Sequence, residues 1–277
     1  MDTKRVTNAL ALGFLWVAAG STVLILGTLI GYVFIKGVGS LSLSFIFTAP
    51  QGVKAEGGIW PTIVATVYVT TLAMLIVTPV AVLAAVYLAE YAVQGRAVRL
   101  IRFAADTLAS VPSIVMGLFG FALFVEAMHF GFSMLSAALA LSFLMLPIVM
   151  RTTEEAIRAV PKYIRWGSYG LGATKWQTVR RTVLPAAMPR IITGIILATG
   201  RAVGETAVVI YTMGTSINLP LSPLDTGRSM TTHLYILATE GINLPTAYGT
   251  ALLLMIMILS FNLIARYIVR RNRRMQG

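Results

Sequence analysis

Two charged residues lie inside an apolar stretch of this sequence. Arg201 and Glu205 belong to the segment ATGRAVGETAVVIYTMG, which otherwise holds mainly apolar and small residues. Because they are four positions apart, a helix would place them on one face. A charge that faces lipid at the bilayer centre costs roughly 2.5 to 3.5 kcal/mol, so we expect both side chains to face protein or water and to form an ion pair.

An arginine in this setting can recognise an oxyanion. Its guanidinium is planar, permanently charged, and matches the oxygens of phosphate with parallel hydrogen bonds. Glu205 would neutralise part of the charge of Arg201 and leave the anion weakly held. If the protein transports an anion, Arg201, Glu205 and Thr206 are the residues that we would place in its translocation path. The alternative is an ion pair that only holds helices together.

A second chemically distinct region is the polar stretch 151–190, between two apolar segments of membrane length. Its basic side chains cannot lie in hydrocarbon, and it is too long for a simple turn between neighbouring helices. Thr152 and Glu155 have the spacing of a capping box, which predicts a short helix that Pro161 ends. We interpret the stretch as a docking loop.

Further local signals predict two more short helices in this stretch. Pro161 suits the first turn of one helix, and Gly172 can adopt the left-handed conformation that closes it. Thr174 is placed to cap the next helix, which we expect Pro185 to end. The result is a pair of short helices joined at Gly172.

The composition indicates which class of protein carries these residues. The 277 residues are 57% hydrophobic and 12% charged, with a mean hydropathy of +0.82. Soluble domains have about a quarter of their residues charged. Several segments exceed the roughly 20 apolar residues that a helix needs to cross a bilayer. Since the chain has no cysteine, disulfides and thiolate metal sites are excluded. We predict an all-α membrane protein.

The positions of the basic residues explain the net charge of +12. They concentrate in alternate loops and in the C-terminal tail, whereas the opposite loops hold only Lys36, Lys54 and Arg228. By the positive-inside rule the basic side is cytoplasmic. This places both termini in the cytoplasm and favours membrane topology over nucleic-acid binding.

The apolar segments predict six spans within a single domain, 1–277. The outer loop 36–60 is expected to hold little regular structure. The outer loop 214–245 is a candidate surface for a solute-binding protein, with a helix that Ser229 caps and that ends near Gly241. The six spans lie at about 9–35, 61–88, 106–128, 132–150, 191–213 and 247–269.

The docking loop carries a family resemblance. Gly172, nine residues and then Thr182-Val183-Leu184-Pro185 resemble the EAA loop of ABC importer permeases. In that family the helix before the glycine inserts into a groove on the ATPase subunit. The family has Glu-Ala-Ala and an aliphatic residue where this chain has Trp166-Gly167-Ser168 and Thr182. The resemblance implies that ATPase coupling involves Trp166, Gly167, Ser168, Gly172, Ala173, Leu184 and Pro185.

Further segments resemble phosphate importer permeases in particular. They are VYLAEYA, RFAADTLASVPSIVMGLFGFALFVE and the run Arg-Ala-Val-Gly-Glu-Thr at 201–206. The resemblance implies a type I permease fold in the cell inner membrane. It also implies a homologous second permease, two cytoplasmic ATP-binding subunits, an extracytoplasmic phosphate-binding protein, and inorganic phosphate as substrate. No cofactor is implied.

Other transport mechanisms remain as alternatives. The chain lacks the GxxxxGK[ST] phosphate-binding loop, so ATP hydrolysis must take place in a partner and the chain itself is not expected to be an enzyme. Composition leaves open an ABC permease for another oxyanion, such as sulfate or molybdate. A secondary transporter is disfavoured because no inverted repeat is evident. An intramembrane hydrolase is disfavoured because no Ser/His or paired aspartates share a helical spacing within the spans.

Overall fold

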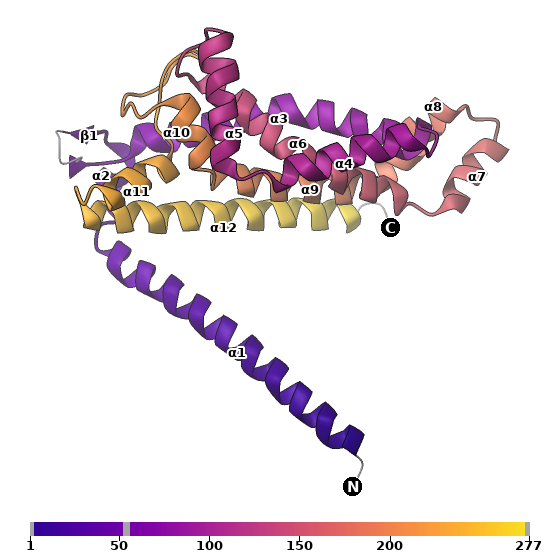
Figure 1. Cartoon of the computed structure of the whole chain (residues 1–277), viewed down its shortest axis with the longest axis horizontal. Helices are drawn as coiled ribbons and strands as arrows, with labels where there is room; N and C mark the ends of the chain where they lie inside the picture. The colour runs from indigo at the N-terminus through magenta and orange to yellow at the C-terminus, as the bar shows by residue number, and fades with distance from the viewer. Residues whose placement is uncertain (1–2, 52–55, 275–277) are drawn as a thin grey trace.

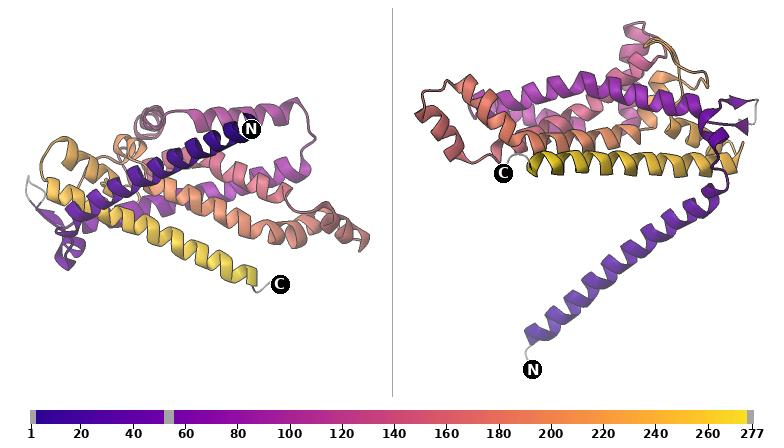
Figure 2. Two further views of the ribbon diagram at one scale, coloured as in Figure 1. Left: turned by 90° about the horizontal axis from the view of Figure 1, so that it is seen from below. Right: turned by 180° about the vertical axis from the view of Figure 1, so that it is seen from behind.

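The first helix stands apart from the others. The computed structural model describes residues 3–51 and 56–274, so Lys54 lies outside the described residues. Helix α1 (Thr3–Val38) contains the expected first span and meets the bundle near its C-terminal end, beside α12 (Leu244–Arg274) (Figure 1). Most of its length diverges from the other helices (Figure 2), and its apolar window has no residue buried inside the chain. This helix therefore presents its apolar surface outwards.

The segment after α1 is more ordered than predicted. It forms a short helix, α2 (Leu43–Phe47), and an antiparallel pair of two-residue strands, β1 (Pro50–Gln51) and β2 (Glu56–Gly57). The prediction of little regular structure in this loop is therefore wrong. The helix forms because the Ser42 hydroxyl caps it by accepting a hydrogen bond from the backbone N–H of residue 45, an interaction too local to show in the pattern of apolar residues.

Two long helices form the centre of the bundle. Helix α3 (Trp60–Val86) continues into a π-helix, η1 (Tyr87–Tyr91), and packs along α6 (Met134–Arg158). Many of the facing residues are alanines, which let the two backbones approach closely. The Ser142 hydroxyl of α6 donates a hydrogen bond of 3.1 Å to the backbone carbonyl of Ala73 in α3. Most other helices pack against this pair.

The third predicted span is not one straight helix. Helix α4 (Arg96–Ser110) is followed by α5 (Ser113–Gly120) and the π-helix η2 (Phe121–Ala127), with a bend of 101° between the two parts. The predicted third span, about 106–128, thus contains a sharp bend that its apolar composition did not indicate. Pro112 causes the break, because it has no N–H to donate and it restricts the preceding residue to an extended conformation.

The polar stretch 151–190 contains less separate structure than predicted, because α6 extends to Arg158. Thr152 lies within α6, where its hydroxyl donates to the carbonyl of Ile148, so the predicted capping box is wrong. The short helix α7 (Lys162–Gly170) follows. Its predicted end is confirmed, since Gly172 adopts a φ of +79°.

The next helix passes through Pro185 without ending. It begins with α8 (Lys175–Thr178), where Thr174 and Gln177 form a capping box, so the predicted cap is confirmed. It continues through the π-helix η3 (Val179–Val183) into α9 (Leu184–Val203). Pro185 was wrongly predicted to end it. The wider π-turn lies directly before the proline and accommodates a residue that cannot donate a backbone hydrogen bond.

The last part of the chain returns to the core. Helix α10 (Ala207–Met213) follows α9 after a break, so the fifth span is not continuous. Helix α11 (Met230–Thr239) begins at its predicted cap, Ser229, and ends before Gly241, whose φ is +63°. The described residues contain five helices of membrane-spanning length and one bent pair, which confirms an all-α membrane fold. Which side of the membrane each end faces stays a prediction.

Candidate functional site

The helix that carries Arg201 breaks three residues later. Since α9 ends at Val203, Arg201 and Glu205 do not share a helix face. The Glu205 carboxylate turns forward and accepts hydrogen bonds from the backbone N–H groups of Ala207 (3.1 Å) and Val208 (3.4 Å). It thus caps α10. The predicted ion pair is wrong: Arg201 is exposed and, among the described residues, forms no ion pair.

Contacts from another helix hold the break between α9 and α10 in place. The Thr231 hydroxyl of α11 donates to the backbone carbonyl of Glu205 at 2.8 Å. Thr206, the third residue of the predicted path, is half-buried at the start of α10 and makes no capping bond with its side chain. The arrangement places Arg201, which has no ion-pair partner among the described residues, close to a fixed break in the helix.

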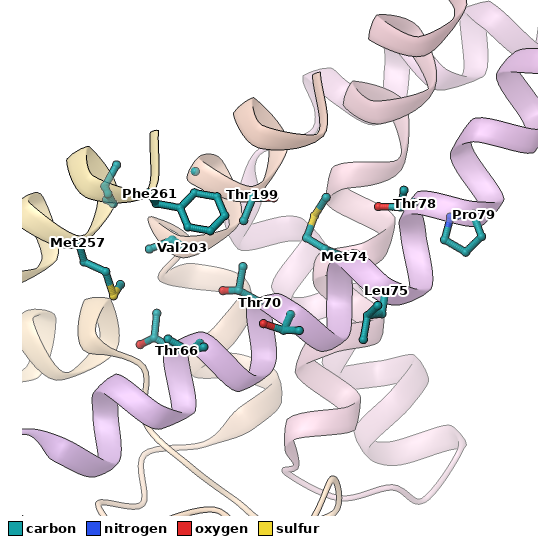
Figure 3. A pocket seen from close by; sticks show the side chains of 14 residues that line it. Thr66, Thr70, Met74, Leu75, Thr78, Pro79, Thr199, Val203, Met257 and Phe261 are labelled. Carbon is teal, nitrogen blue, oxygen red and sulfur yellow. The ribbon is translucent and has the colours of Figure 1, made fainter. Parts of the chain in front are cut away.

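A cavity of about 610 Å³ lies between α3, α9 and α12 (Figure 3). Its walls are mainly apolar, with hydroxyl groups from Thr66, Thr70 and Thr199 among them. Gly200 lines this cavity, but its neighbour Arg201 does not. The structure therefore separates the proposed anion-binding arginine from this apolar space.

The candidate ATPase-coupling region is helix α7 with the turn that follows it. No residue of α7 is fully buried, and the side chains of Tyr163 and Trp166 are 69% and 67% exposed. An added Cβ at Gly172 would meet no atom within 4 Å, so only the left-handed backbone conformation requires glycine there. An exposed aromatic helix ending in a glycine turn is well suited to bind another protein.

The structure divides the seven predicted coupling residues between two places. Five lie on α7 or in the turn after it: Trp166, Gly167, Ser168, Gly172 and Ala173. The other two, Leu184 and Pro185, lie in α9. Leu184 packs against a cluster of buried apolar side chains from η3, α9 and the end of α6, here called the inner core cluster. The Ser168 hydroxyl makes a 2.9 Å hydrogen bond with the hydroxyl of Thr178, which joins α7 to α8. Helix α7, the turn at Gly172 and helix α8 are here called the elbow. Leu184 and Pro185 lie in the helix that continues from it.

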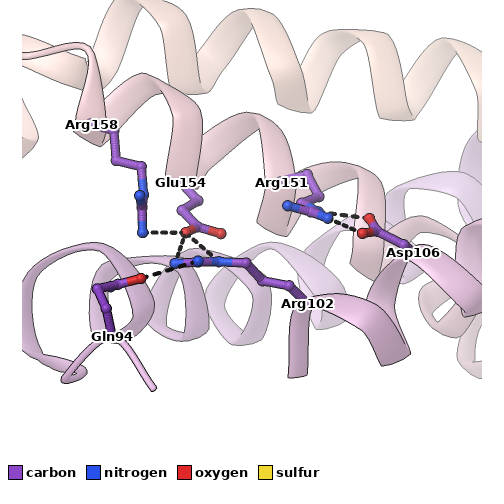
Figure 4. Close-up of polar contacts among 6 residues, drawn as sticks. All are labelled: Gln94, Arg102, Asp106, Arg151, Glu154 and Arg158. Carbon is purple, nitrogen blue, oxygen red and sulfur yellow. Dashed lines mark hydrogen bonds and ion pairs between the residues drawn. The ribbon is translucent and has the colours of Figure 1, made fainter. Parts of the chain in front are cut away.

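A buried carboxylate joins α4 to α6 near the elbow, and the sequence analysis missed it. Glu154 is 4% exposed and forms ion pairs with Arg102 (2.7 Å) and Arg158 (2.9 Å) (Figure 4). Arg151 forms a second ion pair with Asp106 between the same helices. The spacing of Glu154 and Arg158 on one helix was visible in the sequence, but Arg102, the partner of Glu154 on α4, is 52 positions away and gave no local signal.

The outer segment contains a buried histidine that the sequence left without a role. His233 of α11 is fully buried and contacts the Arg228 guanidinium through its Nδ1 atom at 3.4 Å. Burial, and to a lesser degree the charge of Arg228, lower the pKa of His233 from 6.5 to about 4. The imidazole is therefore neutral at neutral pH, which avoids a second positive charge beside Arg228.

Comparison with known proteins assigns this architecture to a family. The model of the family described as "Binding-protein-dependent transport system inner membrane component" matches residues 78–274. That segment contains the elbow, the break between α9 and α10, and the bent third span. The chain belongs to this family. It is thus a multi-pass membrane permease, as the resemblance implied.

Curated relatives extend the similarity over almost the whole permease. It is 36% identical to the probable ABC transporter permease protein YqgI of Bacillus subtilis, over 96% of both chains. It is also 36% identical to the phosphate transport system permease protein PstA 1 of Mycobacterium tuberculosis, over 98% of this chain and 91% of that protein. The expected membership among ABC permeases, in the group that includes phosphate permeases, is confirmed.

Solved structures share the fold of the permease. A bacterial alginate ABC transporter, in complex with a periplasmic protein bound to an alginate pentasaccharide, matches with a TM-score of 0.74 at 15% identity, over 97% of this chain and 96% of that chain. An inward-facing MetNI methionine ABC transporter matches with a TM-score of 0.62 at 21% identity, over 77% of this chain and 94% of that chain. These likenesses confirm the ABC importer permease fold.

Proposed function

We propose that this permease is one of two permease subunits of an ATP-driven importer of inorganic phosphate. The observation that carries the proposal is the similarity to a phosphate transport system permease over 98% of the chain. The segment around Arg201 adds to it, because an exposed guanidinium in an apolar helix is suited to a tetrahedral oxyanion. Phosphate is accordingly the substrate, in preference to sulfate or molybdate.

The translocation path runs past the break between α9 and α10. Arg201 attracts the anion. The bonds from the backbone N–H groups of Ala207 and Val208 to the Glu205 carboxylate keep the backbone of the break in place. Since Glu205 is engaged in capping α10, it does not neutralise Arg201 through contact as the sequence suggested. The affinity for the anion is low, and the anion is released, because a single cationic side chain binds it without a full shell of hydrogen-bond donors.

The second permease subunit covers much of α1. The window of α1 that would cross the membrane has no residue buried within this chain, although the helix is 36 residues long. Two such chains that pack face to face would enclose the exposed arginine between them and shield it from lipid. A homologous partner therefore completes a path of which this chain supplies half.

The elbow binds a cytoplasmic ATP-hydrolysing subunit through α7 and the turn at Gly172. Trp166 occupies the position of the family glutamate, so its contact is apolar and aromatic and not ionic. At the opposite end of the bundle, α2, β1 and α11 lie together (Figure 1), and the loop before α11 exposes the side chains of Leu221 and Leu224. That end receives the extracytoplasmic phosphate-binding protein.

Purification of the tagged permease from its native membrane tests the assembly. The expected companions are one related permease, an ATP-binding subunit at twofold ratio, and a phosphate-binding protein. Isolation of a stable complex of this chain with itself and no ATPase would contradict the proposal.

Substitution of Arg201 tests the path. In reconstituted vesicles Arg201→Ala is expected to abolish phosphate uptake while assembly and ATP hydrolysis persist. Arg201→Lys, which keeps the charge and loses the planar fork, should retain part of the uptake. Normal uptake by the alanine variant would exclude Arg201 from the path.

A further inference from the structure

An ion pair joins the coupling helix to the end of α3. Arg165 of α7 donates two hydrogen bonds to Oε1 of Glu90, from Nε at 3.0 Å and from Nη2 at 2.6 Å. Glu90 lies in η1, the π-helix that continues α3. The side chains of Arg165 and Glu90 are 15% and 8% exposed, so water competes little for these bonds. Removing one partner would therefore leave the other charge largely buried and unpaired.

The same guanidinium also holds the end of α6. It donates to the backbone carbonyls of Ile157 (2.9 Å) and Val160 (2.7 Å). These carbonyls belong to the last turn of α6 and the residues directly after it, where a helix leaves acceptors unsatisfied and favours a positive charge. One planar group with four hydrogen bonds thus connects α3, α6 and α7.

The π-helix η1 contacts the second arm of the elbow as well. The Lys175 ammonium at the start of α8 lies 4.9 Å from the centre of the Tyr91 ring, a cation–π distance. Both arms of the elbow, α7 and α8, therefore reach adjacent residues of η1. π-turns of this kind recur at functional positions in helices.

Two other contacts attach α7 to the bundle: the bond between Ser168 and Thr178, and the packing of Ile164. None of its side chains is fully buried, and Ile164 is its partly buried apolar contact with the inner core cluster. A force applied to the exposed side of α7 consequently reaches α3 and α6 through residues 164 and 165, and reaches α8 through the bond between Ser168 and Thr178.

We propose that Glu90 is a positioning residue that transmits movement of the coupling helix α7 to the membrane-spanning helix α3 through Arg165. This inference rests on the proposed function, since it assigns a route by which the ATPase moves the permease. The joint stays closed throughout the transport cycle, so that α7, η1 and the ends of α3 and α6 move as one unit.

Glu90→Gln in the complete reconstituted importer tests the joint. The amide keeps the size and one acceptor of the side chain but removes its charge. The phosphate transported per ATP hydrolysed is expected to fall about tenfold, a typical magnitude for a coupling between sites. Asp106→Asn is the matched control, because Asp106 is 56% exposed and its partner Arg151 lies on α6, away from α7. This control should leave the ratio unchanged.

Cross-linking separates a joint from a general loss of structure. The chain has no cysteine, so Glu90→Cys with Arg165→Cys creates a unique thiol pair in it. The reduced double variant should hydrolyse ATP with little transport, and a short reducible cross-linker should restore transport. If cross-linking blocks transport or leaves it uncoupled, the pair must open during the cycle and the proposal is overturned.

Different results would refute the proposed function and the role of the Glu90–Arg165 joint. A wild-type importer that takes up no phosphate with ATP refutes the proposed function. A wild-type importer that does so, with Glu90→Gln equally coupled, refutes only the joint. If Glu90→Gln does not assemble, Arg165→Lys takes its place: it keeps the charge, loses the two-pronged contact, and should lower the transport ratio to a lesser degree.

Discussion

Replacement by alanine is expected to affect stability at Glu205 and transport at Arg201. Glu205→Ala removes both hydrogen bonds to the first N–H groups of α10 and a negative charge at that helix end. Loss of a capping side chain costs about 0.5 to 2 kcal/mol. Loss of the charge–dipole interaction costs about 0.3 to 1 kcal/mol more. We therefore expect Glu205→Ala to lower the free energy of unfolding by about 1 to 3 kcal/mol.

Two further variants divide this effect. Glu205→Gln keeps an acceptor oxygen and should lose only the charge contribution of about 0.3 to 1 kcal/mol. Arg201→Ala removes an exposed side chain without an ion pair among the described residues, so its stability should stay within about 0.5 kcal/mol of wild type.

Thermal unfolding of the detergent-purified complex measures the series. A loss of 1 kcal/mol corresponds to about 2 to 4 °C in Tm for chains of roughly this size, so the alanine variant at position 205 should unfold several degrees earlier. Phosphate uptake provides the second readout, in which Arg201→Ala fails despite normal stability. Equal Tm values for Glu205→Ala and wild type, or a marked destabilisation by Arg201→Ala, would refute the assignment.

Three other predictions concern the elbow and the outer segment. Gly172→Val should uncouple ATP hydrolysis from uptake, because the left-handed conformation costs a branched residue about 1 to 2 kcal/mol, whereas Gly172→Asn should be tolerated; normal uptake with valine would count against the elbow. Trp166→Ala should weaken ATPase binding in pull-down assays without changing helix content by circular dichroism, since the indole is 67% exposed; unchanged binding would remove it from the interface. The folded-state pKa of His233 lies below its unfolded value of 6.5, so the unfolded chain binds more protons than the folded chain between pH 6.5 and about 4. The free energy of unfolding should therefore decrease by up to about 3 kcal/mol as the pH is lowered from 6.5 to about 4. His233→Gln should flatten this part of the pH profile, and an unaltered profile would show that another group is responsible.

Local sequence signals predicted the parts of the fold that depend on a few adjacent residues. The caps at Thr174 and Ser229 and the left-handed turn at Gly172 were all identified, because capping and positive φ are decided within one helical turn. The apolar segments likewise predicted an all-α membrane fold, since bilayer thickness sets the helix length.

The failures arose where tertiary contacts override a local signal. Thr152 has the spacing of a cap but lies inside α6, which the buried ion pairs of Glu154 help to stabilise past the apolar segment. Pro185 did not end its helix, because a π-turn precedes it. Glu205 does not pair with Arg201, because the break between α9 and α10 leaves the backbone N–H groups of Ala207 and Val208 free to donate to its carboxylate.

The site was predictable only in part for the same reason. A charge inside an apolar stretch directed attention to Arg201, the family resemblance did so for Trp166, and both side chains are exposed in the structure. Glu90 lies in the segment VYLAEYA and Arg165 directly precedes Trp166, but the two residues are 75 positions apart, so only the folded chain could show that they form a pair.

The most direct test of the account is the uptake of labelled phosphate by proteoliposomes that contain the complete importer. We predict accumulation that requires ATP on the side of the elbow and the phosphate-binding protein on the other side, that persists when ion gradients are abolished, and that excess sulfate or molybdate does not inhibit. Uptake driven by an ion gradient without ATP, or equal uptake of sulfate, would contradict the account.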